Sequence, residues 1–259
     1  MKLGLDYIMN KKAHDSIQGQ TDSNYSYAGI PELWVIEKQL KNYNRDLVLK
    51  FSNYLKPTDQ VLEYGAGIGT LAQLLSSFHQ LKPDCLEIDV RLCEVLTERG
   101  FNNYSSVSEL PRQYDAIYFS NVLEHIEDDR AALRELRPIL KESGVVIIYV
   151  PAFMALYSDF DASVGHYRRY NKKTLAAILE DADFDIVHYE YVDSVGFFVW
   201  FLLKWRNLSK QLKTASAHEE SHPSFKIYDR FVYPISKWLD LLGCKYFLGK
   251  NILMVARKK

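Results

Sequence analysis

The fold of this chain is decided by Val61-Leu62-Glu63-Tyr64-Gly65-Ala66-Gly67-Ile68-Gly69-Thr70-Leu71, in which an apolar run meets three alternating glycines. Apolar residues return at helical spacing at Leu71, Leu74 and Leu75. The pattern predicts a strand over 60–64 that turns sharply into a helix over 69–78, the opening of a βαβ unit. Glycines at such a turn let a ligand approach the backbone without meeting Cβ atoms.

A second predicted strand ends in acidic residues, in Cys85-Leu86-Glu87-Ile88-Asp89. An acid at this place can accept both hydrogen bonds of a ribose diol, so the sequence predicts a nucleotide-like ligand above the glycine turn. The dinucleotide fingerprint requires G-x-G-x-x-G, whereas the glycines here fall at 65, 67 and 69, and an additional acid, Glu63, precedes them. The spacing disfavours a nicotinamide dinucleotide, which stays the alternative ligand.

The chain resembles class I methyltransferases, which use S-adenosylmethionine (SAM), from about Val61 to Val192. The resemblance rests on the E-x-G-x-G-x-G loop, the second-strand acid Glu87, and a fourth strand over 114–120 that runs into Asn121-Val122-Leu123-Glu124-His125-Ile126. It implies an α/β, Rossmann-like fold whose seven-stranded sheet has the order 3-2-1-4-5-7-6, with strand 7 antiparallel. It also implies SAM as the cofactor.

The same resemblance assigns cofactor contacts to particular residues. It places Glu63 near the methionyl ammonium, Glu87 on the ribose hydroxyls and Ile88 against the adenine. Asn121 is expected on the methionyl side. The complete predicted cofactor site consists of Glu63, Tyr64, Gly65, Ala66, Gly67, Gly69, Glu87, Ile88, Ser106, Val107 and Asn121.

The chain is predicted to have four parts. These are an N-terminal lid with a helix (1–56), a SAM-binding core (57–192), a helical insertion (193–250) and a final core strand (251–259). Pro31 opens the N-terminal helix and Pro57 ends it. In the core, Gly144 is the expected turn before a buried strand over 145–150. The insertion takes the place of a short hairpin connection, which indicates a function or a small subdomain.

Two apolar stretches lie in the insertion. The first, 195–205, is apolar up to Leu203, and these nine residues are too few to span a bilayer. It could lie at a membrane surface, cover an apolar substrate tail, or pack as a buried helix. The second stretch, 225–248, has an apolar stripe that we expect to pack in the core. That stripe consists of Tyr228, Phe231, Val232, Ile235, Trp238, Leu239 and Leu242.

Two histidines are candidates for a general base, because the pKa of histidine lies near neutrality. His125 follows Glu124 after the fourth strand, and His166 lies in a loop after the fifth. Alternatively, Glu124 and His125 only orient the helix that follows them. Methyltransferases that bind a divalent ion commonly carry an acid three residues before this pair, whereas this chain has Asn121, a poorer ligand for a hard cation. We therefore expect no metal ion.

The predicted substrate-binding residues are Tyr167, Arg168, Arg169 and Tyr170, in the same loop as His166. Two arginines between aromatic rings can form forked hydrogen bonds to phosphate or carboxylate while the rings stack on a sugar. A solvated basic loop is the alternative. Together with the aromatic insertion, this loop resembles methyltransferases found among bacterial surface-glycan and lipid-linked saccharide enzymes.

Composition and charge fit a globular enzyme. The 259 residues are 47% hydrophobic and 25% charged, which allows a sizeable core. The net charge of −1 gives no case for nucleic acid as a partner. The three cysteines form no C-x-x-C pair, so neither a zinc site nor a disulfide framework is expected. Residues 1–29 lack a long apolar run, so we expect a cytoplasmic protein with peripheral contact at the inner face of the membrane through 195–205.

The sequence thus predicts a SAM-dependent methyltransferase for a small-molecule or lipid-linked acceptor, with a hydroxyl of a sugar, polyketide or quinone-like ring as the leading expectation. The sulfonium is already a good leaving group, so the protein mainly aligns a nucleophile and excludes water. Two other functions stay open, a noncatalytic SAM-binding regulatory module and an NAD-dependent Rossmann oxidoreductase. Stabilisation by S-adenosylhomocysteine (SAH) rather than by NAD distinguishes the last of these.

Overall fold

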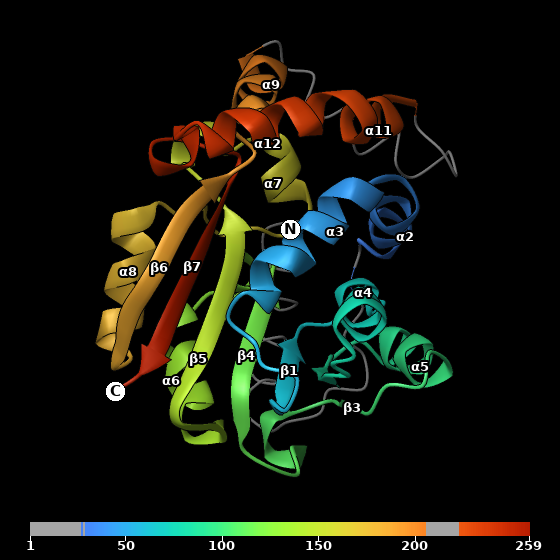
Figure 1. Ribbon diagram of the computed structural model, residues 1–259, viewed down its shortest axis with the longest axis vertical. Helices are drawn as coiled ribbons and strands as arrows, with labels where there is room; N and C mark the ends of the chain where they lie inside the picture. The colour runs from blue at the N-terminus through green and yellow to red at the C-terminus, as the bar shows by residue number, and fades with distance from the viewer. Residues whose placement is uncertain (1–26, 28, 206–222) are drawn as a thin grey trace, which may run out of the picture.

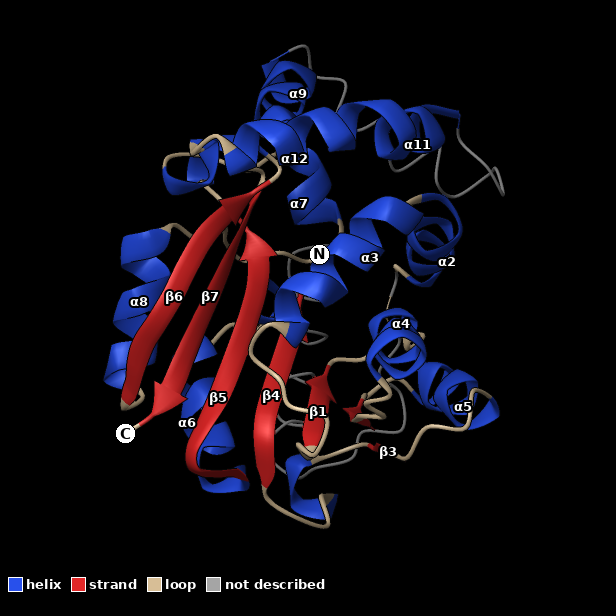
Figure 2. Cartoon of the chain, in the orientation of Figure 1, coloured by secondary structure: helices blue, strands red, loops and turns tan. Residues whose placement is uncertain are grey.

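The computed structural model describes residues 27, 29–205 and 223–259, and shows a seven-stranded sheet between two layers of helices (Figures 1 and 2). The strand order is β3-β2-β1-β4-β5-β7-β6, and β7 runs antiparallel to both of its neighbours while the other pairs are parallel. This order confirms the predicted fold. The strands are β1 (Val61–Tyr64), β2 (Asp84–Leu86), β3 (Asn103–Tyr104), β4 (Tyr114–Ser120), β5 (Leu140–Pro151), β6 (Phe184–Val192) and β7 (Asn251–Lys258).

Helices cover both faces of this sheet. The α-helices are α2 (Ile30–Gln39), α3 (Lys41–Ser52), α4 (Thr70–His79), α5 (Val90–Glu98), α6 (Asp129–Leu136), α7 (Asp159–Ser163), α8 (Lys172–Asp181), α9 (Ser194–Trp205), α11 (Pro223–Ile227) and α12 (Tyr233–Leu241). Shorter helical turns are η1 (Val107–Glu109), η2 (Leu123–His125), η3 (Arg137–Ile139), η4 (Met154–Leu156), the π-helical η5 (Tyr228–Val232) and η6 (Cys244–Tyr246). In the described part of the chain no helix is long and apolar enough to cross a membrane.

Alternation along the central strands sends side chains into two separate cores. Ile117 and Phe119 of β4 share a core with residues of α6 and α8, whereas Ala116 and Tyr118 share the opposite core with residues of α3 and α4. Because both faces are covered, the strands read in the sequence as continuous apolar runs.

The N-terminal helix predicted between Pro31 and Pro57 is wrong as a single helix. The chain forms α2 and α3, which are separated at Leu40, where φ is −103° and ψ is 52°. Asp229 accepts hydrogen bonds from the backbone N–H groups of Asn42 and Tyr43, so a residue of the distant insertion caps the start of α3. Apolar spacing continues across Leu40, and periodicity therefore does not reveal the break.

The predicted turn at Gly144 is also wrong, because Gly144 lies inside β5. Tyr114 pairs with Leu140 and Ala116 pairs with Val145, so β5 carries extra residues opposite a single residue of β4. Ser143 has a positive φ of 62° within this irregularity. A bulge replaces the expected turn.

The insertion forms helices at one end of the molecule, beyond the carboxyl end of β5 (Figure 1). Asp240 of α12 accepts hydrogen bonds from the backbone N–H groups of Asp193 and Ser194, and Ser236 accepts one from Val195, so α12 caps the start of α9. Asp229 caps α3 in the same way. The polar side of this helical segment therefore faces inward.

The predicted core packing of the 225–248 stripe is consequently wrong for most of its members. Phe231, Ile235, Trp238 and Leu242 are exposed. An amphipathic pattern predicts a helix with two different sides, but the need to cap α3 and α9 decides which side faces the protein.

Candidate functional site

The glycine loop after β1 adopts a backbone conformation that suits glycine. Gly65, Gly67 and Gly69 have φ angles of 71°, 56° and 75°. The Gly65 N–H donates to the Leu86 carbonyl at 2.8 Å, which ties the loop to β2. A Cβ atom on Gly65 would lie 2.5 Å from Val122 Cγ2, so this position admits no side chain.

Glu87 lies directly against this loop, after β2. Its Oε2 accepts a hydrogen bond from the Gly67 N–H at 2.8 Å, and its Oε1 accepts from the Ile88 and Asp89 N–H groups. The side chain is buried, and burial raises the pKa of Glu87. The structure thus brings the predicted ribose acid and the loop glycines together.

Three further predicted cofactor residues lie beyond the ends of β3 and β4. Ser106 is buried and forms a hydrogen bond with Ser108, and Val107 packs against the core. Asn121 is exposed and has a φ of 54°. These positions border the loop side of the sheet, and their contacts with the cofactor stay a prediction.

Glu63 and Tyr64 are buried among core residues. Glu63 accepts a hydrogen bond from the Tyr118 hydroxyl at 2.9 Å, and burial raises the pKa of Glu63 to about 8. Tyr64 stacks on Phe119 with ring centroids 4.7 Å apart. Both side chains already have partners inside the protein, and a contact with the methionyl ammonium stays a prediction.

Helix α2 lies next to the glycine loop. Leu33 Cδ1 is 3.2 Å from the position that a Cβ atom on Gly67 would take. Glu37 holds the helix there, because it accepts hydrogen bonds from Thr70 Oγ1 at 2.7 Å and from both terminal nitrogens of Arg99. The last turn of α2 is therefore fastened to α4 and to the residue that follows α5.

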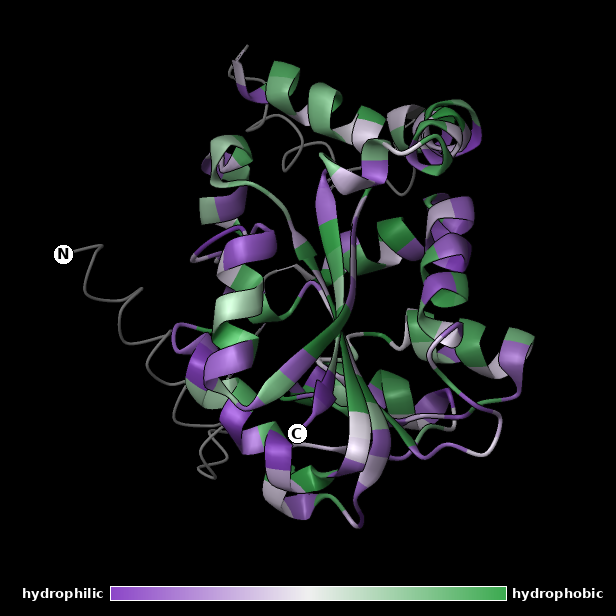
Figure 3. Cartoon of the chain, turned by 60° about the vertical axis from the view of Figure 1, so that its left-hand side comes forward, coloured by the Kyte–Doolittle hydropathy of each residue, from purple (hydrophilic) through white to green (hydrophobic). Residues whose placement is uncertain are grey.

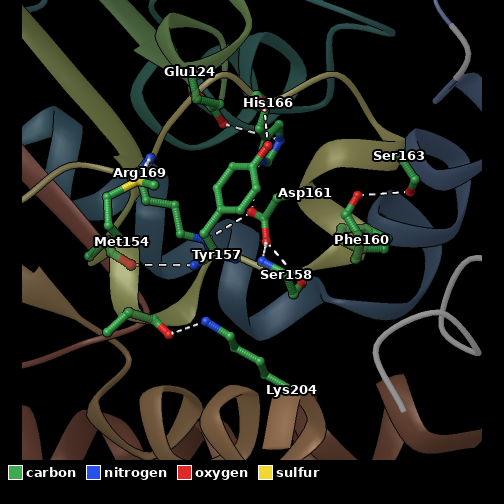
Figure 4. Close-up of polar contacts among 12 residues, drawn as sticks. Glu124, Met154, Tyr157, Ser158, Phe160, Asp161, Ser163, His166, Arg169 and Lys204 are labelled. Carbon is green, nitrogen blue, oxygen red and sulfur yellow. Dashed lines mark hydrogen bonds and ion pairs between the residues drawn. The ribbon is translucent and has the colours of Figure 1, made fainter. Parts of the chain in front are cut away.

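A second cluster of titratable side chains lies where β4 and β5 lead into their loops (Figure 4). His166 Nδ1 is 2.9 Å from Asp161 Oδ1, which also accepts a hydrogen bond from Arg169 Nε at 2.8 Å. Glu124 Oε1 is 3.9 Å from His166 Nε2. Glu124 is fully buried, and neither of its carboxyl oxygens has a hydrogen-bond partner among the described residues.

The electrostatics of this cluster separate the two predicted base candidates. Burial acts to raise the pKa of Asp161, but the hydrogen bond from His166 and the charge of Arg169 outweigh it and hold that pKa at about 2. Burial lowers the pKa of His125 to about 3, and the His125 ring meets the His166 ring edge-on at 4.6 Å. Burial raises the pKa of Glu124 to about 7. His166 has a charged partner that orients it, whereas His125 is held neutral.

Glu124, His125 and His166 each offer one ligand atom, and these atoms lie within 4.8 Å of one another. The three residues could hold a divalent ion. The absence of an acid at position 121 does not exclude a metal ion, because His166 would supply the third ligand from a different loop. The expectation that no metal takes part stays a prediction.

The two arginines of the predicted substrate loop have partners inside the protein. Arg168 pairs with Asp129 at 2.7 Å, and Arg169 is buried and pairs with Asp161. Sequence reasoning missed both of these acids. The available signal for them was that arginines in a partly buried loop require carboxylate partners.

The two tyrosines of the loop also contact the protein. The Tyr170 hydroxyl donates to Asp129 and the side chain is buried, so Tyr170 fixes the loop from inside. Tyr167 is partly exposed, and its backbone N–H donates to the Glu124 carbonyl at 2.8 Å. The structure therefore brings the substrate loop to the Glu124 cluster, while acceptor binding by these residues stays a prediction.

A family model described as "Methyltransferase domain" matches residues 36–189, which is more than half of the chain. Phosphoethanolamine N-methyltransferase 2 of Haemonchus contortus, solved with S-adenosyl-L-methionine, is 17% identical, with a TM-score of 0.59 over 92% of this chain and 58% of that one. A SAM-dependent methyltransferase from Thermotoga maritima is 17% identical, with a TM-score of 0.54 over 88% and 94%.

The [4+2]-cyclase SpnF is 19% identical, with a TM-score of 0.55 over 84% of this chain and 80% of that one. A comparison with curated protein sequences gives no match. At these identities the solved structures establish the fold alone, because one fold hosts many functions.

The family model spans the parts of the chain that carry the site, from α2 to β6. The glycine loop presents a backbone without Cβ atoms, and Glu87 presents a buried carboxylate beside it, which fits the ribose of SAM. SAM is the cofactor of this fold. The chain belongs to the methyltransferase domain family and has the class I SAM-dependent methyltransferase fold.

Proposed function

We propose that this protein is an enzyme that transfers the methyl group of SAM to a hydroxyl of a small or lipid-linked acceptor. Sugars, polyketides and quinone-like rings are the acceptor classes, and the place of action is the cytoplasm or the inner face of the membrane. The observation that supports an enzyme best is the Asp161–His166 pair beside the buried Glu124. A module that only binds SAM has no use for an oriented histidine at this position.

The chemistry requires a base and an aligned acceptor. When bound, SAM supplies a methyl group on a positively charged sulfur that leaves readily. Asp161 accepts the Nδ1 proton of His166 and so fixes the tautomer in which Nε2 carries a lone pair. His166 Nε2 takes the hydroxyl proton as the acceptor oxygen bonds to the methyl carbon and the carbon–sulfur bond breaks. The products are a methyl ether, SAH and a proton that passes from His166 to water.

Burial divides the substrate loop within this proposal. Tyr167 and Arg168 are partly exposed and bind the acceptor, whereas Arg169 and Tyr170 are buried and hold the loop in position. Arg168 has its guanidinium 5.5 Å from the Tyr167 ring centroid, so a charged group and an aromatic face lie together. A sugar that carries phosphate or carboxylate matches this pair.

The test compares His166→Ala with His125→Ala in transfer of a labelled methyl group from SAM to a panel of sugars, quinols and polyketides. We expect His166→Ala to lose roughly 10²–10⁴-fold in turnover. His125→Ala should lose less, because burial holds that ring neutral. SAH affinity, measured by calorimetry, should be unchanged in both variants.

Three outcomes would contradict parts of the proposal. SAM binding without transfer to any acceptor indicates a regulatory module, and thermal stabilisation by NAD in place of SAH indicates an oxidoreductase. A chelator such as EDTA should leave turnover unchanged. If EDTA abolishes turnover and Mn²⁺ or Zn²⁺ restores it, Glu124, His125 and His166 hold an ion.

A further inference from the structure

The insertion exposes a set of large apolar side chains, which we call the apolar band. It consists of Phe198 and Phe201 of α9, Phe231, Ile235 and Trp238 of η5 and α12, and Phe247 after η6. Phe231 and Trp238 are each 60% exposed and Phe247 is 78% exposed. The helices at the top of Figure 3 are accordingly green over much of their length. Phe231, Ile235 and Trp238 recur at i, i+4 and i+7, so these three exposed side chains share one face of the helical segment, and monomeric soluble proteins rarely expose large apolar faces.

Hydrogen bonds between α12 and the start of α9 keep the apolar side of α12 on the surface. Asp240 and Ser236 must stay on the inner side of α12 to accept from the N–H groups at the start of α9. A rotation of α12 that buried Trp238 would withdraw both acceptors and leave those buried amides without partners. The exposure of the part of the band on α12 is therefore a fixed property of the fold.

Along the described helical segment from α11 to α12, two exposed side chains carry positive charge and no exposed side chain carries negative charge. Lys226 and Arg230 are exposed on the same helical segment, whereas both acids of that segment, Asp229 and Asp240, are buried as helix caps. A second copy of the chain placed symmetrically on this face would bring like charges together. Anionic phospholipid headgroups complement the cations, and an exposed tryptophan such as Trp238 suits the boundary between headgroups and acyl chains.

We propose that the apolar band docks this protein on the surface of an anionic bilayer. The inner side of α9 faces the substrate loop, since the Arg169 guanidinium lies 5.5 Å from the Trp200 ring centroid and Lys204 Nζ donates to the Ala155 carbonyl at 2.7 Å. In a docked protein α9 would therefore lie between the substrate loop and the headgroups. The lipid-linked acceptor rests on the proposed function, whereas the docking itself does not.

The experiment is flotation of the full chain with vesicles of phosphatidylglycerol and phosphatidylcholine, compared with vesicles of phosphatidylcholine alone. We expect binding to the anionic vesicles, and about tenfold or greater weakening in the Phe231→Ser, Trp238→Ser double variant, since two rings leave the interface. Phe78→Ser is the matched control, because Phe78 is 49% exposed on α4, away from the band. Lys226→Glu with Arg230→Glu should weaken binding to the anionic vesicles selectively.

The melting temperature of each variant shows whether it folds, and its SAH affinity shows whether it binds the cofactor. The docking proposal is thereby tested independently of the methyltransferase assignment. Wild-type protein that binds SAH but never floats with anionic vesicles overturns the docking proposal and leaves a soluble acceptor. A dimer that the double variant dissociates, together with no flotation, shows that the band joins two copies of the chain. Equal flotation of wild type and double variant also overturns the proposal.

Discussion

At the scale of single residues, Glu87 serves both the loop and the ligand. It accepts the Gly67 N–H and so shapes the glycine turn, and its carboxylate lies where the ribose of SAM is expected. We predict that Glu87→Ala weakens SAM binding roughly ten- to hundredfold, because charge-assisted hydrogen bonds contribute on the order of 1.5–3 kcal/mol. Calorimetry measures the affinity.

Gly67→Val tests the same predicted cofactor site by adding a side chain to the glycine loop. The φ of 56° strains a branched residue, and its side chain would crowd Leu33 of α2 and the approach of the ligand. SAM affinity should fall by about tenfold or more if the variant folds. Glu94→Ala, which removes an exposed acid of α5, is the control for both variants and should bind SAM normally. Unchanged affinity in folded Glu87→Ala and Gly67→Val would refute the cofactor assignment.

A buried carboxyl, Glu63, gives a prediction about pH. Burial raises its pKa in the folded protein to about 8, from an ordinary value of 4.5. The folded state therefore holds a proton that the unfolded state has released, and stability falls as the pH rises from about 4.5 to about 8. Glu63→Gln should flatten this decline, because the amide stays neutral and its oxygen still accepts from Tyr118.

Melting temperatures of both proteins across that pH range provide the measurement. Glu124, whose pKa burial also raises, contributes a decline of the same sign to both proteins, so only the difference between them reports on Glu63. If the two curves run parallel, Glu63 is not the titrating group.

Residues of the site were predictable where the chemistry is local in sequence. The glycines and Glu87 follow one another at fixed spacing, and the structure joins them by the hydrogen bond between Gly67 and Glu87. His166 and its partner Asp161 lie five residues apart in the segment after β5, but the approach of His166 to Glu124 depends on the loops after β4 and β5 meeting. The spacing of these residues in the sequence does not predict that the two loops meet.

At the scale of elements, we expect α2 to cover the cofactor site, and the side chain of Glu37 holds this helix against its neighbours. Glu37 binds Thr70 and Arg99, and Leu33 then lies next to Gly67. We predict that Glu37→Ala speeds the release of SAH by about tenfold, because a partly buried charged hydrogen-bond pair is lost. Stopped-flow fluorescence gives the release rate. Lys38→Ala, an exposed position on the same helix, is the control, and equal rates in the two variants would show that α2 does not cover the cofactor.

Element boundaries were predictable to within a few residues, but the orientation of elements was not. The break at Leu40 and the outward stripe of α12 share one cause, since Asp229, Ser236 and Asp240 cap helices far away in the sequence. A helix-capping residue can be predicted from the sequence when it directly precedes its own helix. It cannot be predicted in this way when a helix distant in the sequence supplies it.

At the scale of the whole molecule, the sheet order was predictable because the resemblance to class I methyltransferases covers β1 to β6. The insertion lies outside that resemblance, and its placement depends on contacts with α3 and α9. The nucleotide side of the molecule is therefore the predictable part. The placement of the insertion and the pairing of the substrate loop required the structure.

The position of β7 has a consequence for how the chain is made. In the described sheet β6 pairs with β7 alone, yet the whole insertion separates the two strands along the chain. During translation β6 emerges first, the apolar band follows, and the strand that completes the sheet comes later. Closing so long a loop is slow compared with local helix formation. We therefore expect β7 to join the sheet only after the helices of the insertion have formed, so β6 waits without a strand partner until the end of the chain arrives.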